Sequence, residues 1–396
     1  MKATSGFADS LATLPRFDPE SFIDADVRRA LAAPRGDLVA LAALLSPAAE
    51  LRLEEIAQHA AAQTIRRFGR AVRLFAPLYL SNECLSSCTY CGFAKGLPIA
   101  RRTLTVDEVA QEARILTGRG FQHVLLVAGE HRVAVSADYV LACIERLRPE
   151  VTSLSVETQT WSDDTYARLA VAGCEGVVHY QETYDRDRYA QVHVKGWKRD
   201  FDRRLASVER AADAGIRRLG LGALIGLAAD WRADVLALAA HASYLVRRSW
   251  RTEVTVALPR IKDNAAGYPP LVTLSDRQYV QALAALRLYE PEAGIVLSTR
   301  ETPQLRDGLV RICATTLSAG SSTEPGGYSS PGNAQEQFAL SDERTPAQVA
   351  AAIGSLGYEP VGKDAFPLVP TEPADGWKPD TSKSRVPVGD LGSDRG

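Results

Sequence analysis

Three of the six cysteines of this chain, Cys84, Cys88 and Cys91, lie within eight positions, in the stretch SNECLSSCTYCGF. Closely spaced thiolates are metal ligands. Structural zinc usually takes two separated Cys/His pairs, and this chain has no second C-x2-C, although His123 and His131 are candidate fourth ligands. An iron–sulfur cluster fits better, because thiolates are its usual ligands. Three thiolates predict a 4Fe–4S cluster with one iron open to a further ligand.

Polar side chains also close most of the β-rich runs that follow the cysteines. They are Glu130, Glu157, Gln181, Glu182, Arg260, Arg300, Glu301, Ser318 and Ser321. The carboxyl ends of the strands of a β/α barrel meet at one mouth, where active sites lie. We therefore expect these groups to share one polar site beside the cysteines.

The elements that would position these residues alternate between strands and helices. Eight β-rich runs are predicted at residues 74–80, 123–129, 153–159, 176–183, 219–226, 253–260, 294–301 and 312–320. Amphipathic helical stretches lie between most of them, and one opens with Thr105 and Glu108 spaced as a capping box. Eight such units predict an α/β fold, a TIM-type (β/α)8 barrel. The alternative, an open doubly wound sheet, needs a G-x-G-x-x-G loop that does not follow the first or second run.

Three segments are expected along the chain. Residues 1–73 read as a helical N-terminal extension, and residues 74–345 as the barrel. Residues 346–396 form a C-terminal segment that is expected to be disordered after residue 370, because it becomes rich in Pro, Gly, Ser and charge.

Composition bounds the function. The net charge is −2, which gives no electrostatic case for binding nucleic acid or an anionic membrane. No run of 18 apolar residues predicts a membrane span, and the first twenty residues do not read as a signal peptide. Cys143, Cys174 and Cys313 stand alone in apolar surroundings, as buried thiols of a reducing compartment do. We therefore expect a cytoplasmic enzyme.

The C-x3-C-x2-C spacing, with an aromatic residue before the last cysteine, resembles the signature of radical S-adenosyl-L-methionine (SAM) enzymes. That resemblance implies that SAM itself is the missing ligand of the open iron. A longer set of stretches resembles the 2-iminoacetate synthases, the tyrosine lyases of thiamine thiazole biosynthesis. They run from about Leu74 to Phe338 and are LYLSNECLSSCTYCGF, RRTLT, HVLLVAGEH, VHYQETYDRDRY, GLGALIGL, LSTRE and STEPGGY.

The resemblance implies a reaction. In such enzymes a reduced cluster splits SAM into methionine and a 5′-deoxyadenosyl radical, which takes a hydrogen atom from L-tyrosine. The Cα–Cβ bond then breaks, giving 2-iminoacetate (dehydroglycine) and p-cresol. The protein must exclude water and hold the reacting hydrogen near the radical.

The resemblance also implies residue roles, position by position. Cys84, Cys88 and Cys91 would ligate the cluster. The SAM-binding residues would be Tyr90 near the adenine, Gly129 and Glu130 at the methionyl amine, Glu157 and Glu182 at the ribose, and Arg204 at the methionyl carboxylate. Related enzymes often have two glycines where this chain has Ala128 and Gly129. Arg300 would bind the substrate carboxylate, with Ser298, Ser318 and Ser321 orienting the substrate further.

Partners follow from the same resemblance, and three rival functions stand against it. It implies a complex with thiazole synthase, which consumes the unstable imine, and a flavodoxin- or ferredoxin-type reductant. The rivals are a tryptophan lyase of thiopeptide biosynthesis, the maturase of iron-only hydrogenase, and a non-catalytic metal-binding barrel subunit. The maturase holds a second cluster through three further cysteines, and residues 314–396 of this chain contain none.

Overall fold

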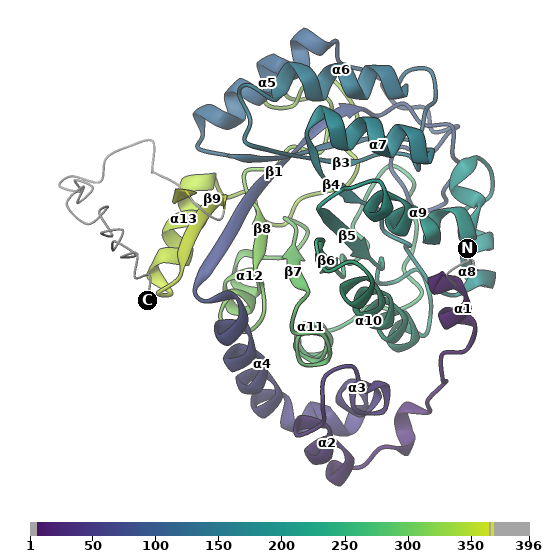
Figure 1. The fold of residues 1–396 in the computed structure, drawn as a ribbon, viewed down its shortest axis with the longest axis vertical. Coiled ribbons are helices and arrows are strands. Elements are labelled where there is room, and N and C mark those ends of the chain that lie inside the picture. Colours follow the sequence, from purple (N-terminus) through teal and green to yellow (C-terminus); the bar gives the residue numbers. More distant parts are fainter. Residues whose placement is uncertain (1–5, 364–365, 368–396) are drawn as a thin grey trace, which may run out of the picture.

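The computed structural model describes residues 6–363 and 366–367. Within this part, eight consecutive parallel strands form a closed barrel, because β1 pairs with both β2 and β8 (Figure 1). The strands are β1 (Ala71–Ser81), β2 (His123–Ala128), β3 (Ser153–Glu157), β4 (Cys174–Val178), β5 (Arg218–Gly222), β6 (Glu253–Ala257), β7 (Gly294–Leu297) and β8 (Thr316–Ser318). The predicted (β/α)8 barrel is confirmed.

The predicted strand positions hold for all eight runs, and the fourth and the last runs differ most from the observed strands. Of the predicted run 312–320, only Thr316–Ser318 forms β8. The backbone N–H groups of Cys313 and Ala314 instead donate to the carbonyl of Leu309, at 2.8 and 2.9 Å, and so complete the turn after the preceding helix. Those residues cannot also join the sheet.

Helices surround the barrel. They are α5 (Val106–Gly118), α6 (Ala137–Leu147), α7 (Asp163–Ala172), α8 (Arg186–Val192), the 3-10 helix η3 (Trp197–Arg199), α9 (Phe201–Asp213), α10 (Trp231–Arg248), α11 (Asp276–Tyr289) and α12 (Pro303–Val310). The predicted capping box opens α5, where Thr105 Oγ1 accepts from the Glu108 N–H and the Glu108 carboxylate accepts from the Thr105 N–H. No helix of the described residues is both long and apolar enough to cross a membrane.

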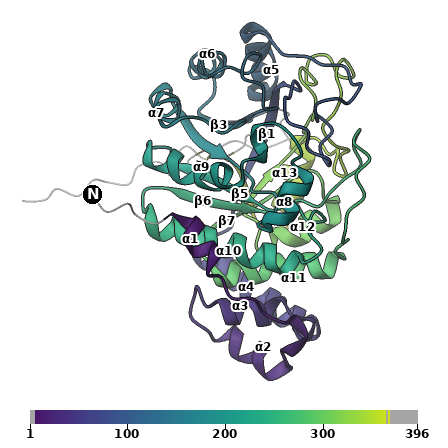
Figure 2. The same cartoon turned by 90° about the vertical axis from the view of Figure 1, so that its right-hand side faces the viewer.

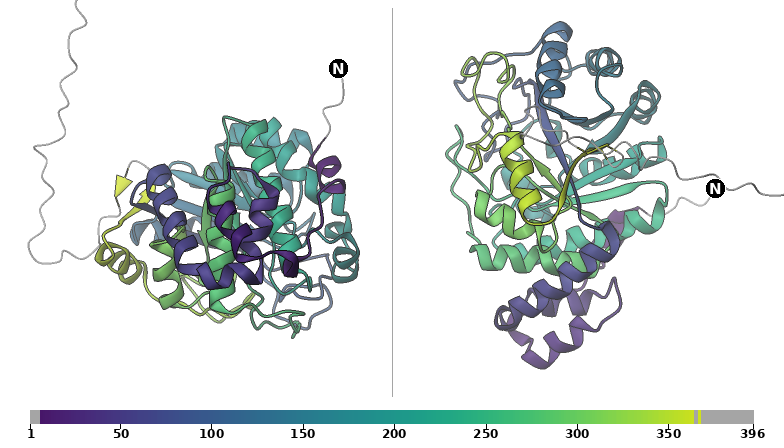
Figure 3. Two further views of the ribbon diagram at one scale, coloured as in Figure 1. Left: turned by 90° about the horizontal axis from the view of Figure 1, so that it is seen from below. Right: turned by 90° about the vertical axis from the view of Figure 1, so that its left-hand side faces the viewer.

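The N-terminal residues are helical, as expected, and pack on one side of the barrel (Figures 2 and 3). They form α1 (Phe7–Ala12), η1 (Pro19–Ser21), α2 (Asp24–Leu31), α3 (Leu38–Leu45), η2 (Pro47–Arg52) and α4 (Leu53–Phe68). Helices α3 and α4 pack against α11, and α1 packs against α9 and α10. The described part of the extension therefore packs on helices at the outside of the barrel.

Two short strands beyond the barrel were not predicted. After α13 (Pro346–Ser355), β9 (Glu359–Lys363) pairs parallel with the start of β1, and β10 (Phe366–Pro367) pairs with β9. Arg73 pairs with both Thr316 of β8 and Val361 of β9, so β9 lies on the opposite edge of β1 from β8. The predicted disorder after residue 370 falls outside the described residues.

Candidate active site

One cavity opens at the carboxyl ends of the barrel strands, and every residue predicted above to bind the cluster, SAM or the substrate lines it. Residues from the cysteine loop, from the ends of the strands and from the segment after β8 meet there. The segment after β8 covers part of the mouth, because Gln337 N–H donates to Thr323 O at 3.0 Å and Ala339 N–H to Asp263 O at 3.0 Å. The barrel topology therefore gathers residues that are more than 230 positions apart, from Cys84 to Ser321.

The cysteine loop follows β1 and is held from two sides by backbone hydrogen bonds. On one side Leu85 N–H donates to the carbonyl of Glu130 at 2.8 Å. On the other side Ser87 N–H donates to Lys195 O, and Thr89 N–H donates to Val192 O, both at 2.9 Å. The thiols are thus held on a loop fixed by its neighbours, as a preformed ligand set requires.

The three thiols are shielded from water. Cys88 is buried and the other two are half-buried. Burial raises the pKa of the Cys84 thiol to about 11 and raises that of Cys88. Backbone N–H groups of Ser86 and Phe93 point at the sulfurs of Cys84 and Cys91, each at 3.4 Å. Such donors stabilise metal-bound thiolates.

The donor set fits a cluster better than a single ion. Among the described residues no three or more His, Cys, Asp or Glu side chains gather in a way that could hold one metal ion. A zinc ion needs its ligands within about 2.3 Å of one point, whereas the thiolates of a cubane bind different irons. The two candidate zinc histidines lie elsewhere, His123 bonding Ser155 at 3.1 Å and His131 accepting from the Ala134 N–H at 3.0 Å.

Gly129, after β2, lets the cysteine loop approach closely. A Cβ at this position would lie 2.4 Å from the carbonyl oxygen of Glu83 and 3.0 Å from Cys84 Cβ. Only glycine fits such a contact with backbone. Of the pair Ala128 and Gly129, the second position is therefore the one that the packing of the loop requires to be glycine.

Tyr90 is fixed by a histidine that the sequence analysis did not identify. His193 Nδ1 donates to the carbonyl of Tyr189 at 2.9 Å, so His193 Nε2 accepts from the Tyr90 hydroxyl at 2.8 Å. Burial lowers the pKa of His193 to about 2, which keeps the imidazole neutral and able to accept. The Tyr90 ring is held at the cavity wall by this contact.

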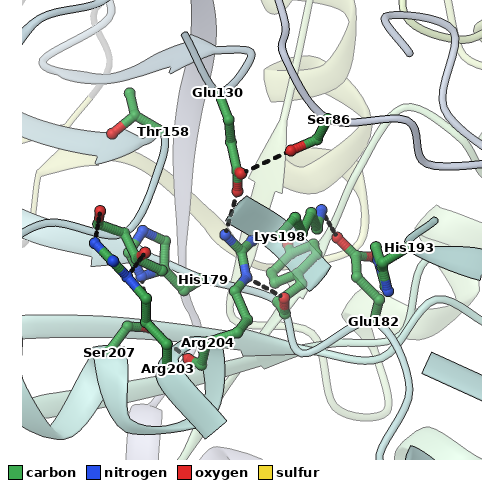
Figure 4. Close-up of polar contacts among 12 residues, drawn as sticks. Ser86, Glu130, Thr158, His179, Glu182, His193, Lys198, Arg203, Arg204 and Ser207 are labelled. Atoms are coloured by element: carbon green, nitrogen blue, oxygen red, sulfur yellow. Dashed lines mark hydrogen bonds and ion pairs between the residues drawn. The ribbon is translucent and has the colours of Figure 1, made fainter. Parts of the chain in front are cut away.

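Glu130 and Arg204 meet across the cavity wall (Figure 4). The guanidinium of Arg204 donates to Glu130 Oε1 at 3.2 Å and to the Tyr180 carbonyl at 2.9 Å, and Ser86 Oγ donates to Glu130 Oε2 at 3.1 Å. A carboxylate and a guanidinium side by side match the amine and carboxylate of an α-amino acid. The arrangement can therefore receive a zwitterionic group.

Glu182 and Glu157 form the acidic part of the wall. Glu182 pairs with Lys198 at 2.6 Å, a residue that the sequence analysis did not identify (Figure 4). Glu182 is also the one described residue other than glycine with a positive φ, 71°, a conformation that costs on the order of 1–3 kcal/mol and concentrates at functional sites. The carboxylate of Glu157 makes no hydrogen bond to any described residue. Burial, followed by the negative charge of Glu182, raises the pKa of Glu157 to about 7.

Arg300 is a half-buried cation without an anionic partner in the described part of the chain. Its guanidinium lies 3.4 Å from the centroid of the Phe338 ring, and its one side-chain hydrogen bond is a long contact of 3.5 Å to the Arg260 carbonyl. Burial lowers the pKa of Arg300, which shows the cost of holding this charge away from water. Such a group calls for an anion from a ligand.

The three serines near Arg300 differ in their contacts. Ser298 Oγ accepts from the Arg300 N–H at 3.4 Å, and Ser318 Oγ accepts from the Thr299 N–H at 3.2 Å, so both brace the backbone after β7. Ser321 Oγ is buried and has no hydrogen-bond partner among the described residues. Of the three, Ser321 is the one whose hydroxyl makes no hydrogen bond to any described residue.

Three polar residues expected at the mouth do not line the cavity: Arg260, Glu301 and Gln181, whose buried side-chain amide donates to the Phe201 carbonyl at 3.4 Å. Arg260 donates to the carboxylate of buried Glu301 at 2.9 Å and pairs with Asp276 at 2.8 Å. Neither Arg260 nor Glu301 lines the cavity. The expectation that all of the polar strand ends share one site was therefore wrong for Gln181, Arg260 and Glu301.

Comparisons with known proteins agree with this geometry. Residues 78–238 match the Radical SAM superfamily, and residues 258–359 match the Biotin and Thiamin Synthesis associated domain. The chain is similar to 2-iminoacetate synthase of Escherichia coli K12, with 43% identity over 340 residues, 86% of this chain and 90% of that protein. The Salmonella typhimurium enzyme of the same name gives the same identity and coverage. Among solved structures, the FeFe-hydrogenase maturase HydG from Carboxydothermus hydrogenoformans matches with a TM-score of 0.81 and 31% identity, covering 90% of this chain and 83% of that one.

Proposed function

The chain belongs to the 2-iminoacetate synthase family of the radical SAM superfamily, and from this premise we propose that it cleaves the Cα–Cβ bond of L-tyrosine to 2-iminoacetate and p-cresol, supplying the thiazole ring of thiamine. Its cofactors are a 4Fe–4S cluster and SAM. The observation that carries the proposal is the unpaired guanidinium of Arg300 in the cavity that also holds the three thiols.

The cofactor half of the cavity has a residue suited to each part of the cluster and of SAM. Cys84, Cys88 and Cys91 would hold the cluster. Glu130 and Arg204 would take the amine and carboxylate of SAM, with Gly129 allowing the close approach of the loop. Glu157 and Glu182 would accept hydrogen bonds from the ribose hydroxyls, and the ring of Tyr90 would face the adenine. When bound, these cofactors supply radical hydrogen abstraction.

In the substrate half, Arg300 would bind the carboxylate of tyrosine, because a guanidinium offers two parallel donors to a carboxylate. Ser321 has a free hydroxyl for the substrate, while Ser298 and Ser318 would act by holding the segment that carries Arg300. A carboxylate on Arg300 would replace the partner that the guanidinium lacks. This contact fixes one end of the substrate and so limits where its reacting hydrogen can lie.

Two of the four tyrosines that line the cavity, Tyr79 and Tyr90, have hydroxyls engaged in hydrogen bonds. The hydroxyl of Tyr79 donates to Gln337 Oε1 at 2.7 Å, and that of Tyr90 donates to His193 at 2.8 Å. Each O–H hydrogen is therefore already engaged. This arrangement disfavours abstraction of the hydroxyl hydrogens of Tyr79 and Tyr90.

The proposal extends to partners, compartment and domain division. We propose thiazole synthase as the acceptor of the imine, a flavodoxin- or ferredoxin-type protein as the reductant, and a cytoplasmic setting. The division into an extension (1–73), a barrel (74–345) and a C-terminal segment (346–396) is likewise proposed. β1 begins at Ala71 and β9 pairs with it, so both flanking segments pack on the barrel.

The test is anaerobic turnover of the reconstituted protein with L-tyrosine or L-tryptophan. Formation of 5′-deoxyadenosine and p-cresol with tyrosine is expected. Turnover of tryptophan to an indolic acid in place of this would support the thiopeptide-type lyase, and no 5′-deoxyadenosine with either amino acid would support a non-catalytic role.

The pKa of Glu157 predicts a pH-dependent affinity for SAM. With a pKa of about 7, Glu157 is about one-tenth ionised near pH 6 and about nine-tenths ionised near pH 8. The ionised carboxylate is the better acceptor for ribose hydroxyls, so the affinity should rise with pH, by up to about tenfold over this range. Equilibrium binding of SAM at several pH values measures it. Glu157→Gln is the matched control, and a rise of equal size in that variant would remove Glu157 from the ribose site.

A further inference from the structure

An apolar surface patch lies against the cysteine loop. We name it the apolar patch, and it consists of Leu85, Val133, Val194 and Trp197. Their exposed fractions are 38%, 82%, 46% and 42%. These four residues come from three segments of the chain, and contacts between the segments bring the residues together.

The three segments touch around the loop. Leu85 N–H donates to Glu130 O, close to Val133, and Val194 N–H donates to Ser87 O at 3.3 Å. A Cβ at Gly196, beside Trp197, would lie 2.5 Å from Ser86 Oγ. The patch is thus continuous with the loop that carries the thiols.

Cations surround the patch. They are Lys95, Arg132, Lys195, Arg199 and Arg203, which we call the cationic rim. The guanidiniums of Arg132 and Arg203 both lie over the Trp197 ring, that of Arg203 at 4.2 Å from its centroid. A shallow hollow beside Trp197 is lined by Arg199 and Arg203.

On the described surface, the cationic rim gathers five cations without an ion pair around one apolar patch, whereas several arginines elsewhere are neutralised by neighbouring carboxylates. Arg168, Arg210 and Arg248 form ion pairs with aspartates at 2.6 Å elsewhere on the surface. None of the five rim cations has a carboxylate within ion-pair distance among the described residues. The acidic side chains nearby are engaged, because Glu130 pairs with Arg204, Asp200 caps α9 and Asp202 pairs with Arg186. The half-buried Glu83 is the exception.

The apolar patch is also close to Cys88, one of the proposed cluster ligands. Cys88 forms a backbone bridge with His193, the residue before Val194. The proposed reaction needs one electron from outside for each cleavage of SAM, while the thiols themselves are buried or half-buried. An electron donor seated on the patch would approach the cluster closely without entering the cavity.

We propose that the apolar patch and its cationic rim form the docking surface for a small acidic one-electron donor protein. This inference rests on the proposed function and adds the place where the reductant binds. The unpaired cations match an acidic partner and would guide its approach, and Trp197 supplies the apolar contact. One electron passes from the reduced donor to the oxidised cluster, and the donor leaves oxidised by one electron.

The test replaces two rim cations that lie outside the cavity. The holoenzyme variant K195E/R199E is compared with the unchanged protein and with R66E/R251E, which lowers the net charge equally at distant exposed positions. Arg66 lies on α4, and Arg251 lies beside exposed Trp250 just before β6. The probe is flavodoxin, whose Kd is measured by titration calorimetry at about 50 and about 300 mM salt.

The K195E/R199E variant should change flavodoxin binding and flavodoxin-driven turnover but leave dithionite-driven turnover unchanged. The K195E/R199E variant should bind flavodoxin at least about tenfold more weakly at low salt and lose most of the salt dependence, and R66E/R251E should not. Tyrosine turnover driven by flavodoxin hydroquinone should fall in parallel, while turnover driven by dithionite stays unchanged. The milder variant K195Q/R199Q should give a smaller change in the same direction. It serves as the test if the K195E/R199E variant fails to fold.

The docking surface is overturned if K195E/R199E binds flavodoxin with an unchanged Kd, or if R66E/R251E loses as much flavodoxin affinity. It is also overturned if K195E/R199E loses as much dithionite-driven turnover as flavodoxin-driven turnover, or if the variant weakens binding of thiazole synthase and not of flavodoxin. Failure of dithionite-driven turnover in the unchanged protein would instead count against the proposed function.

Discussion

Replacing any one of Cys84, Cys88 and Cys91 by Ala is expected to abolish the cluster and all tyrosine cleavage. Three thiolates line the cavity, and the described residues provide no other His or Cys cluster that could take over a lost ligand. Loss of one thiolate opens a second iron to water, and the cubane loses its hold on the protein. The measurements are iron content and visible absorbance after anaerobic reconstitution, followed by 5′-deoxyadenosine formation.

The matched controls are the other three cysteines. Cys143, Cys174 and Cys313 are buried in the hydrophobic core. Their replacement by Ala removes a small buried side chain, which affects stability but not the ligand set. A variant of Cys174 that lost the cluster while the Cys91 variant kept it would show that the ligands are wrongly assigned.

Replacing Arg300 by Ala is expected to weaken tyrosine-dependent turnover by at least about 2 kcal/mol, or about 30-fold in kcat/KM. The reason is that the substrate carboxylate would enter a buried site without its charged partner. SAM cleavage in the absence of tyrosine should change little, because Arg300 lies apart from the Glu130–Arg204 pair in the contacts of the site. Steady-state kinetics together with tyrosine binding measure both effects.

Arg300→Lys and Arg260→Ala sharpen this prediction. Lysine keeps the charge but lacks the two-donor fork, so it should restore part of the affinity. Arg260 pairs with Glu301 and does not line the cavity, so its loss should lower stability more than tyrosine affinity. Equal tyrosine affinity in Arg300→Ala and the unchanged protein would remove Arg300 from the substrate site.

The parts that were predictable from sequence are those set by local pattern. The alternation of β-rich and amphipathic runs identified the barrel. The spacing of Cys84, Cys88 and Cys91 predicted a ligand set, and the three thiols line one cavity. Since the mouth of a barrel gathers the ends of its strands, Glu157 and Arg300 could be placed in one site without any structure.

The parts that were missed depend on contacts between distant segments. His193 and Lys198 belong to the connection around η3, and nothing in their local sequence shows that it docks on the cysteine loop. Arg260 and Glu301 looked like site residues because sequence cannot show that they neutralise each other. The sequence of β9, EPVGK, lacks the pattern of a strand. β9 forms because β2 pairs with β1 only from Ala76 onward, so the start of β1 has an edge that β9 can join.

One measurement tests the central claim most directly, which is that the chain breaks tyrosine at Cα–Cβ and stops there. The reconstituted protein is turned over anaerobically with L-tyrosine, and p-cresol, glyoxylate from hydrolysed 2-iminoacetate, and carbon monoxide trapped by haemoglobin are quantified together. We predict p-cresol and glyoxylate in equal amounts, with no carbon monoxide, because residues 314–396 contain no cysteine for a second cluster. Carbon monoxide in amounts comparable to p-cresol, or the absence of p-cresol, would contradict the account.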